Sequence, residues 1–503
     1  MNPVRCFAIL LLLVPAVLRA DVRLPAVISN HMVLQRDAVV PIWGWADPGE
    51  KITVGFAGQT RTAVAAADGA WRVALDPQRA SGTGATLTIA GKNQITIDDV
   101  LVGEVWLGSG QSNMAMTVAR SLEPEREAAA ANFSRIRFFK ETSAAAASPQ
   151  SIGKGEWVVC SPQTTPASSA VLYFFGRELH QKLGVPVGLI NSSVGGTPIE
   201  SWIAPEAQRA QAELKPFFEA AQAEAAAIAS PTARKKYEAD LAAWEAGQSA
   251  AKATKKKAAK KPQDPAEVAA RKVDVGGLFN GKIAPLIPYA VRGFLWYQGE
   301  ANSTPAKVPF YAAQMKLLVT DWRARWGAEL PFAWAQLPNF TGAGRDWPAL
   351  REAQLAALAL PRTGMGINLD IGEAADIHPR NKQEAGRRLA FWALGEVYNE
   401  KVPATSGPLP AGHEIRGAEI VLRFKHAHGG LVAKDGALRG FEIAGEDRVW
   451  RPAQARVAVE TVIVASDAVP RPVAARYAWE NNPAASLFNG AGLPATPFRT
   501  ERW

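Results

Sequence analysis

Cysteine is almost absent from this chain, and its scarcity limits how the fold can be stabilised. Only two cysteines occur in 503 residues, Cys6 near the start and Cys160 further along. If the first residues are removed, one thiol is left, and one thiol cannot form an internal disulfide. Packed cores must therefore stabilise the fold. The 48% of hydrophobic residues and the 16 tryptophans can supply such cores, and they argue against a globally disordered chain.

Long apolar segments are also scarce. Residues 7–17 form a short apolar run that Arg5 precedes and the tripeptide 18–20 follows. This run is too short to span a bilayer comfortably, and its flanks are typical of a secretory signal peptide over residues 1–20. Because no later stretch is long and apolar enough for a membrane helix, we expect an exported protein without a membrane span, either periplasmic or extracellular.

Charged residues make up only 20% of the chain, and the net charge of +9 is partly local. Residues 251–261 contain six lysines and no acidic residue, with alanine and threonine between them. A nucleic-acid site needs basic residues combined with aromatic residues or placed on a folded face. The lysine run therefore predicts a solvated helical surface or a loose insertion, and no nucleic-acid partner. The oligomeric state cannot be inferred from these features.

The hydrophobic pattern divides the chain into three regions. Over residues 21–102, short β-rich runs separated by turn residues predict a β-sandwich. Over residues 103–400, apolar strands alternate with helices, which predicts an α/β domain with a parallel sheet covered on both faces. Residues 205–271 have a helical, lysine-rich composition and are expected to be an insertion in that domain. From residue 401 to 503 the β pattern returns and predicts a second β domain.

The first chemical motif follows a predicted strand in the segment 104–114. Gly108 and Gly110 allow a sharp turn that would present Ser112 at the start of a helix. A serine hydroxyl becomes a nucleophile when a base and a favourable helix-terminal field lie beside it. The alternative is that Ser112 only caps the helix. The segment does not fit the Gly-x-Ser-x-Gly motif of α/β-hydrolases.

Two further motifs also follow predicted strands. Gly195 and Gly196 could direct a backbone N–H group toward a developing oxyanion, or they could form an ordinary turn. In the segment 296–302, Gln298 and Asn302 can donate side-chain hydrogen bonds, and Glu300 can accept them. Buried polar groups of this kind usually satisfy one another, so Glu300 could equally be a structural strut.

The fourth motif contains a histidine that follows a candidate acid. Pro379 suits the first position of a helix, which would place His378 at the positive helix end and favour a neutral imidazole. Asp376 stands two residues before His378 and could orient its ring. The alternative is a capping aspartate followed by a surface histidine.

His378 is the only histidine of six that follows a predicted sheet strand beside a carboxylate. The other five are His31, His180, His413, His426 and His428. The pair His426 and His428 offers two ligands, which do not make a zinc site. Because ligands bind at the carboxyl ends of parallel strands, the four motifs together predict one catalytic site for acyl transfer.

These motifs resemble those of the sialate O-acetylesterase-like branch of the SGNH-hydrolase superfamily. The similar segments are 110–114, 195–197, 278–281, 284–288, 296–300 and 376–379, and the match extends in order over residues 22–500. The resemblance implies an SGNH-type (flavodoxin-like) parallel-sheet domain flanked by N- and C-terminal β-sandwich regions. It also implies a serine esterase that removes O-acetyl groups from carbohydrates without a metal or organic cofactor.

The resemblance further implies roles for individual residues. Ser112 would be the nucleophile, His378 its base and Asp376 the orienting acid. Gln111 and Glu300 lie inside the matching motifs and are expected to help form the substrate site.

The implied oxyanion hole combines two backbone groups with one side chain. The backbone donors would be the N–H of Ser112 and that of Gly195 or Gly196. The superfamily's usual asparagine is replaced here, with Gln298 as the first candidate for the side-chain donor and Asn302 as the reserve.

The acid departs from the pattern of the superfamily. The superfamily commonly places it three residues before the histidine, where this chain has Ala375. Asp376 is one position too late, so Asp370 is the reserve candidate.

Two other functions are compatible with the sequence. The same chemistry could act on acetylated xylan or pectin, because the tryptophans suit stacking on sugars without specifying one. A carbohydrate-binding protein with an inert α/β domain is the alternative outside enzymes, and the completeness of all four motifs argues against it.

Overall fold

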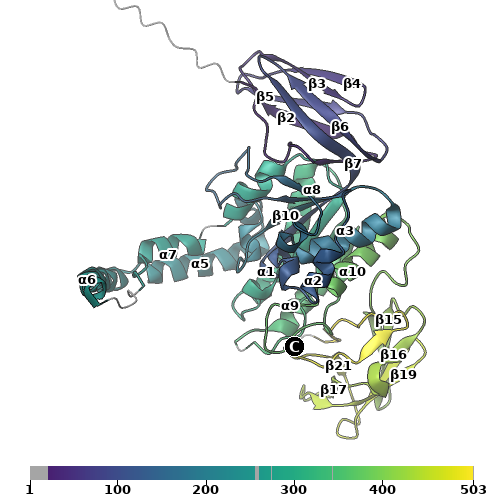
Figure 1. Ribbon diagram of the computed structural model, residues 1–503. Coiled ribbons are helices and arrows are strands. Elements are labelled where there is room, and N and C mark those ends of the chain that lie inside the picture. Colours follow the sequence, from purple (N-terminus) through teal and green to yellow (C-terminus); the bar gives the residue numbers. More distant parts are fainter. Residues whose placement is uncertain (1–20, 255–259, 274, 343, 502) are drawn as a thin grey trace, which may run out of the picture.

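The computed structural model describes residues 21–254, 260–273, 275–342, 344–501 and 503 (Figure 1). The predicted signal peptide and Lys255, Lys256 and Lys257 of the lysine run lie outside the described residues. Figure 1 shows an N-terminal β region, a central region of sheet and helices, and a C-terminal β region.

The N-terminal region joins the central region through one long strand, β7. The strands of this region are β1 (Val33–Gln35), β2 (Val40–Trp45), β3 (Lys51–Phe56), β4 (Gln59–Val64), β5 (Ala70–Leu75), β6 (Ser81–Ala90) and β7 (Gln94–Gly110). The first part of β7 pairs antiparallel with β6, and its last residues pair parallel with β10 and β11. β7 thus crosses the predicted domain boundary at residue 102.

The central sheet is mixed, with the strand order β13-β12-β11-β7-β10-β8-β9. Its other strands are β8 (Ile136–Lys140), β9 (Trp157–Val159), β10 (Val187–Ser193), β11 (Gly293–Tyr297), β12 (Phe332–Ala335) and β13 (Thr363–Gly366). All neighbouring strands are parallel except β9, which pairs antiparallel with β8 at the edge. The fold class is therefore α/β, as the strand and helix pattern predicted.

Helices cover both faces of this sheet. The helices are α1 (Ser112–Ala115), α2 (Pro124–Ala129), α3 (Ala170–Leu183), α4 (Pro205–Arg209), α5 (Lys215–Ile228), α6 (Pro231–Thr254), α7 (Pro265–Val273), α8 (Val308–Trp326), α9 (Trp347–Ala356) and α10 (Lys382–Trp392). On one face, Trp106 of β7 packs edge-on against Phe175 of α3 and Trp392 of α10. On the other face, Trp322 of α8 packs against Trp296 of β11. Helices α5, α6 and α7 form an arm that projects from the central region (Figure 1).

The C-terminal region consists of small antiparallel sheets. Its strands are β14 (Leu409–Arg416), β15 (Glu419–Lys425), β16 (Leu431–Ala433), β17 (Phe441–Ala444), β18 (Arg451–Pro452), β19 (Gln454–Ala458), β20 (Thr461–Ala465), β21 (Ala474–Tyr477), β22 (Leu487–Asn489) and β23 (Phe498–Arg499). Arg351 of α9 is fully buried and donates hydrogen bonds to the carbonyls of Glu480 and Asn481, which attaches this region to the central one. None of the described helices has the length and apolar character needed to cross a membrane.

Candidate active site

The predicted nucleophile lies where β7 ends and α1 begins. Gly110 has a φ of 132°, and a Cβ atom there would lie 2.2 Å from the carbonyl oxygen of Tyr297, so only glycine fits this turn. Gln111 then donates its backbone N–H to the same carbonyl at 3.0 Å and occupies the N-cap position. Ser112 is the first residue of α1 and therefore does not cap the helix.

The side chains of Ser112 and His378 meet although 266 positions separate them in the chain. The Nε2 atom of His378 lies 2.8 Å from the Oγ atom of Ser112. His378 comes from the segment between β13 and α10, and its side chain is 29% exposed. A hydroxyl within hydrogen-bond reach of an accessible imidazole is the arrangement that a serine nucleophile and its base require.

The helix after His378 begins later than predicted. α10 starts at Lys382, and Pro379 lies before the helix, so the prediction that Pro379 takes the first helical position was wrong. The reason is a stronger cap downstream, because Asn381 accepts a hydrogen bond from the N–H of Glu384 at 3.2 Å. His378 therefore precedes α10 by four residues.

The surroundings of His378 keep its imidazole neutral. Burial lowers the pKa of His378 below its ordinary value, and the positive charges of Lys382 and Arg120 lower it further. Asp376 opposes this effect and raises the pKa, but the net direction is downward. A neutral imidazole can accept the serine proton at neutral pH.

The two candidate acids have different environments. The Oδ1 atom of Asp376 lies 3.6 Å from Nδ1 of His378 and accepts the backbone N–H of His378 at 2.8 Å. The side chain of Asp376 is 54% exposed. Asp370 instead pairs with Arg388 through two contacts of 2.6 and 2.9 Å. Asp376 is thus the carboxylate next to the imidazole, whereas Asp370 forms an ion pair with Arg388.

The glycine pair after β10 lies next to Ser112. A Cβ atom built on Gly195 would lie 3.5 Å from Cβ of Ser112. Gly196 is exposed, with a φ of 73° that favours glycine. The Gly195 backbone is therefore close enough to the nucleophile to contribute to an oxyanion hole.

Gln298 is fully buried, and its amide N–H group faces protein acceptors. Its Nε2 atom lies 2.8 Å from Oδ1 of Asn302 and 3.2 Å from both Oε1 of Gln111 and the carbonyl of Thr197. Its Oε1 atom accepts a hydrogen bond from the hydroxyl of Tyr311 at 2.9 Å. These contacts place Gln298 behind Gln111 rather than open to a ligand.

Asn302 belongs to the same buried network. Its Nδ2 atom donates to Glu200 at 2.8 Å, and its Oδ1 atom accepts the backbone N–H of Ile199 at 2.9 Å. Gln111 differs from its neighbours, because its Oε1 atom is an acceptor in this network whereas its Nε2 atom has no hydrogen-bond partner among the described residues. The amide of Gln111, one residue before Ser112, is therefore the side-chain donor left available.

Glu300 lies behind the catalytic pair and does not contact it directly. The Oε1 atom of Glu300 accepts a hydrogen bond from Nδ2 of Asn113. Asn113 also donates to the carbonyl of Ile377 and accepts from Lys382. No role was predicted for Asn113 or Lys382 from the sequence. Their positions inside and just after two motif segments were the only signal.

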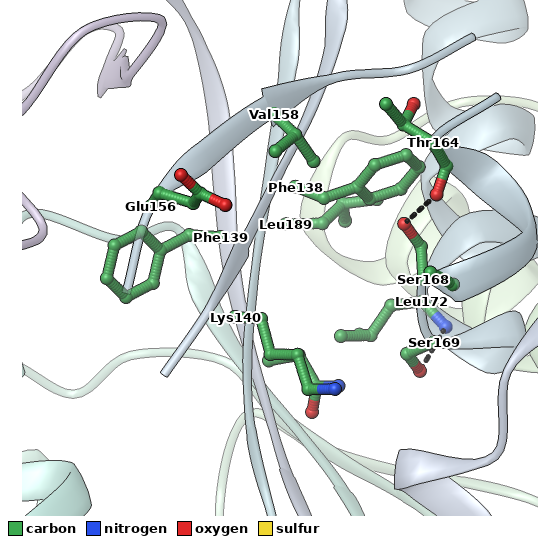
Figure 2. A pocket seen from close by; sticks show the side chains of 12 residues that line it. Phe138, Phe139, Lys140, Glu156, Val158, Thr164, Ser168, Ser169, Leu172 and Leu189 are labelled. Atoms are coloured by element: carbon green, nitrogen blue, oxygen red, sulfur yellow. Dashed lines mark hydrogen bonds between the residues drawn. The ribbon is translucent and has the colours of Figure 1, made fainter. Parts of the chain in front are cut away.

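A cavity of about 250 Å³ lies near the site, between the edge of the sheet and the start of α3. Figure 2 shows apolar side chains, among them Phe138, Val158 and Leu189, facing hydroxyl groups from residues 164–169. Ser169 of this wall donates to the carbonyl of Met114 in α1 at 2.6 Å. The cavity thus borders the helix that carries Ser112, although Ser112 and His378 do not line it.

Histidine, cysteine and acidic side chains do not gather into a metal site anywhere in the described part of the chain. The rings of His426 and His428 lie 5.8 Å apart in the C-terminal region.

Comparisons with known proteins identify the family. Residues 281–391 match the family model described as carbohydrate esterase, sialic acid-specific acetylesterase. The chain is 28% identical to sialate O-acetylesterase of Mus musculus and to that of Homo sapiens, covering 98% and 95% of those proteins and 99% and 97% of itself. It is 35% identical to a crystallised carbohydrate acetylesterase from Xanthomonas citri, with a TM-score of 0.80, 96% of this chain and 100% of that one covered. The predicted resemblance to sialate O-acetylesterases is confirmed, and the chain belongs to the same family of carbohydrate acetylesterases as this 35% identical relative.

Proposed function

We propose that this protein is a serine esterase that hydrolyses O-acetyl esters of carbohydrates, with acetylated sialic acid as its substrate. The observation that carries the proposal is the 2.8 Å contact between Ser112 Oγ and His378 Nε2. Membership in the acetylesterase family supports the substrate class. The leader-like residues 1–20 support export of the enzyme, and the motif set supports an SGNH-type central domain between two β-sandwich regions.

The proposed reaction has two acyl-transfer steps. In the first, the Oγ atom of Ser112 attacks the acetyl carbonyl carbon while Nε2 of His378 takes the hydroxyl proton. The sugar oxygen then leaves with that proton, and acetyl-Ser112 remains. In the second step, His378 takes a proton from water, the resulting hydroxide attacks the acetyl group, and acetate departs as Ser112 recovers its proton.

The negative oxygen of each tetrahedral intermediate needs hydrogen-bond donors. We assign this role to the backbone N–H groups of Ser112 and Gly195, two residues that lie next to each other, together with the amide of Gln111. Gln298 acts indirectly, because its contact with Oε1 of Gln111 fixes the orientation of that amide. A single donor of this kind typically contributes about 3 kcal/mol to lowering the barrier.

A substrate panel tests the proposed specificity. Acetate release should be faster from O-acetylated sialic acid than from acetylated xylan or pectin fragments, by about tenfold or more in kcat/KM, since a site that hydrogen-bonds a particular sugar discriminates against others. The measurement is an enzymatic acetate assay at matched acetyl concentrations. Faster release from xylan or pectin would transfer the assignment to a polysaccharide acetylesterase, the alternative that the sequence left open.

The two candidate acids should separate in their effects. Asp376→Asn should lower kcat by about 10- to 100-fold, less than for a buried triad acid, because Asp376 is half exposed and 3.6 Å from the ring. Asp370→Asn should leave kcat within about threefold of wild type but lower the free energy of unfolding by about 2 kcal/mol, because it weakens the ion pair with Arg388. Kinetics and denaturant unfolding of both variants measure this difference. If Asp376→Asn had wild-type kcat and Asp370→Asn were inactive, Asp370 would be the acid of the triad.

A further inference from the structure

A buried polar cluster lies directly behind Ser112 and His378. Its members are Lys382, Asn113 and Glu300, which are 0%, 0% and 2% exposed. Burying an ammonium group and a carboxylate is costly unless each is paired or hydrogen-bonded. The reaction scheme above uses none of these three side chains, so their presence calls for a separate explanation.

The contacts of Asn113 connect the two halves of the catalytic pair. Nζ of Lys382 donates to Oδ1 of Asn113 at 2.6 Å. Nδ2 of Asn113 donates to Glu300 and, at 3.0 Å, to the carbonyl of Ile377. Because Asn113 follows Ser112 and Ile377 precedes His378, this one amide holds the two catalytic segments together. Lys382 in turn fixes which way the amide points.

The positive charge of Lys382 also acts on the imidazole of His378. Burial lowers the pKa of Lys382 to about 7, while Glu300, Asp376 and Glu373 oppose that decrease. Lys382 is therefore protonated in the acidic range in which His378 titrates. Its ammonium group contacts Asn113 and lies over the ring of Tyr297, whose centroid is 5.3 Å away.

We propose that Lys382 is a positioning residue of the active site, which aligns Ser112 with His378 through Asn113 and, by its buried charge, favours the neutral form of the His378 imidazole. This inference rests on the proposed function, since it assigns Lys382 to the same site. The charge and the hydrogen bond act separately: a neutral amine can still donate to Asn113, whereas only the ammonium form repels a proton on His378.

The direction of the charge effect follows from the groups that face His378. Asp376, in the same segment, favours the imidazolium form, whereas Lys382 from α10 and Arg120 from the short 3-10 helix Val118–Arg120 disfavour it. A general base must be neutral to act, so a lower pKa extends activity to lower pH. Removal of Lys382 should raise the pKa of His378 and move the acidic limb of the pH–rate profile to higher pH.

The test is the pH dependence of kcat/KM for 4-nitrophenyl acetate in Lys382→Met and Lys382→Arg. In Lys382→Met the acidic limb should move upward by about 0.5 to 1 pH unit, which is the usual scale for loss of one nearby charge. The rate on the plateau should also fall about three- to tenfold, because Asn113 loses one hydrogen bond. In Lys382→Arg, which retains the charge, the limb should stay within about 0.2 pH unit of wild type, well below the scale of a lost charge.

Arg120→Met is the matched control, because Arg120 also repels a proton on His378 but is exposed. Its effect should disappear at 1 M NaCl, where the Debye length is about 3 Å. The shift in Lys382→Met should persist at that salt concentration, since buried charges are screened much less.

An acidic limb of Lys382→Met at the wild-type position would overturn the proposal, as would a shift that salt abolishes. If Lys382→Met does not fold, the double variant Lys382→Met/Glu300→Gln, which removes both buried charges, takes its place. Its acidic limb in the pH dependence of kcat/KM should also lie above that of wild type. Failure of this inference is distinguishable from failure of the proposed function, because Ser112→Ala would be inactive in the first case and active in the second.

Discussion

Ser112→Ala should lower kcat by about 10⁴- to 10⁶-fold, the range seen when the nucleophile of a catalytic triad is removed. The substitution deletes the Oγ atom that lies 2.8 Å from Nε2 of His378 and leaves the backbone donors of the oxyanion hole in place. Ser112 is only partly buried and is not the N-cap of α1, so the free energy of unfolding should change by less than about 0.5 kcal/mol. Steady-state kinetics on 4-nitrophenyl acetate and thermal unfolding measure both quantities.

Ser109→Ala is the matched control for that experiment. Ser109 lies three residues earlier in β7, is fully buried, and its Oγ atom has no hydrogen-bond partner within the described part of the chain. Its replacement should leave kcat within about twofold, as expected for a substitution that removes no stabilising contact. Comparable activity in Ser112→Ala and Ser109→Ala would remove Ser112 from the mechanism.

His378→Gln should reduce kcat by about 10⁴-fold or more, because among the described residues His378 is the side chain that contacts the Oγ atom of Ser112 and can take its proton. The double variant Ser112→Ala/His378→Gln should be no slower than the slower single variant, since residues that act as one unit are strongly non-additive. His413→Gln, in strand β14 of the C-terminal region, is the control and should keep wild-type activity. Losses that multiply in the double variant would show that the two residues act independently.

Much of the fold was predictable because strand periodicity and turn residues are local signals. The alternation of apolar runs and helices predicted a parallel sheet in the central region, and the parallel pairing of β7, β10, β11, β12 and β13 confirms it. Parallel strands place their carboxyl ends at one edge, which is why Ser112 and His378 were expected to meet. The contact between them is present, and their catalytic roles are the proposals tested above.

Other features depend on contacts that the sequence does not encode locally. The start of α10 was misplaced because Asn381 caps the helix more effectively than Pro379 begins it. The connection between the N-terminal and central regions was not predicted. A single long strand, β7, pairs with strands of both regions and has no turn at the expected boundary. Glu300 was weighed as a possible strut, and its link to Lys382 through Asn113 brings together three distant segments.

The sequence motifs predicted the family of the protein but not the hydrogen-bond partners of each side chain in the site. The motifs identified the esterase family, which the comparisons confirm. They indicated Gln298, with Asn302 as the reserve, as the side-chain donor and not Gln111, because the difference lies in which amide already has protein acceptors. Such hydrogen-bond networks require the three-dimensional structure.

The most direct test of the nucleophile and its base is covalent labelling with a fluorophosphonate, followed by peptide mapping by mass spectrometry. We expect one phosphonate per chain, attached to Ser112, and labelling at least about 100-fold slower in His378→Gln, because the reagent needs an activated serine. A label on another residue, or equal labelling rates in wild type and His378→Gln, would contradict the assignment of Ser112 and His378.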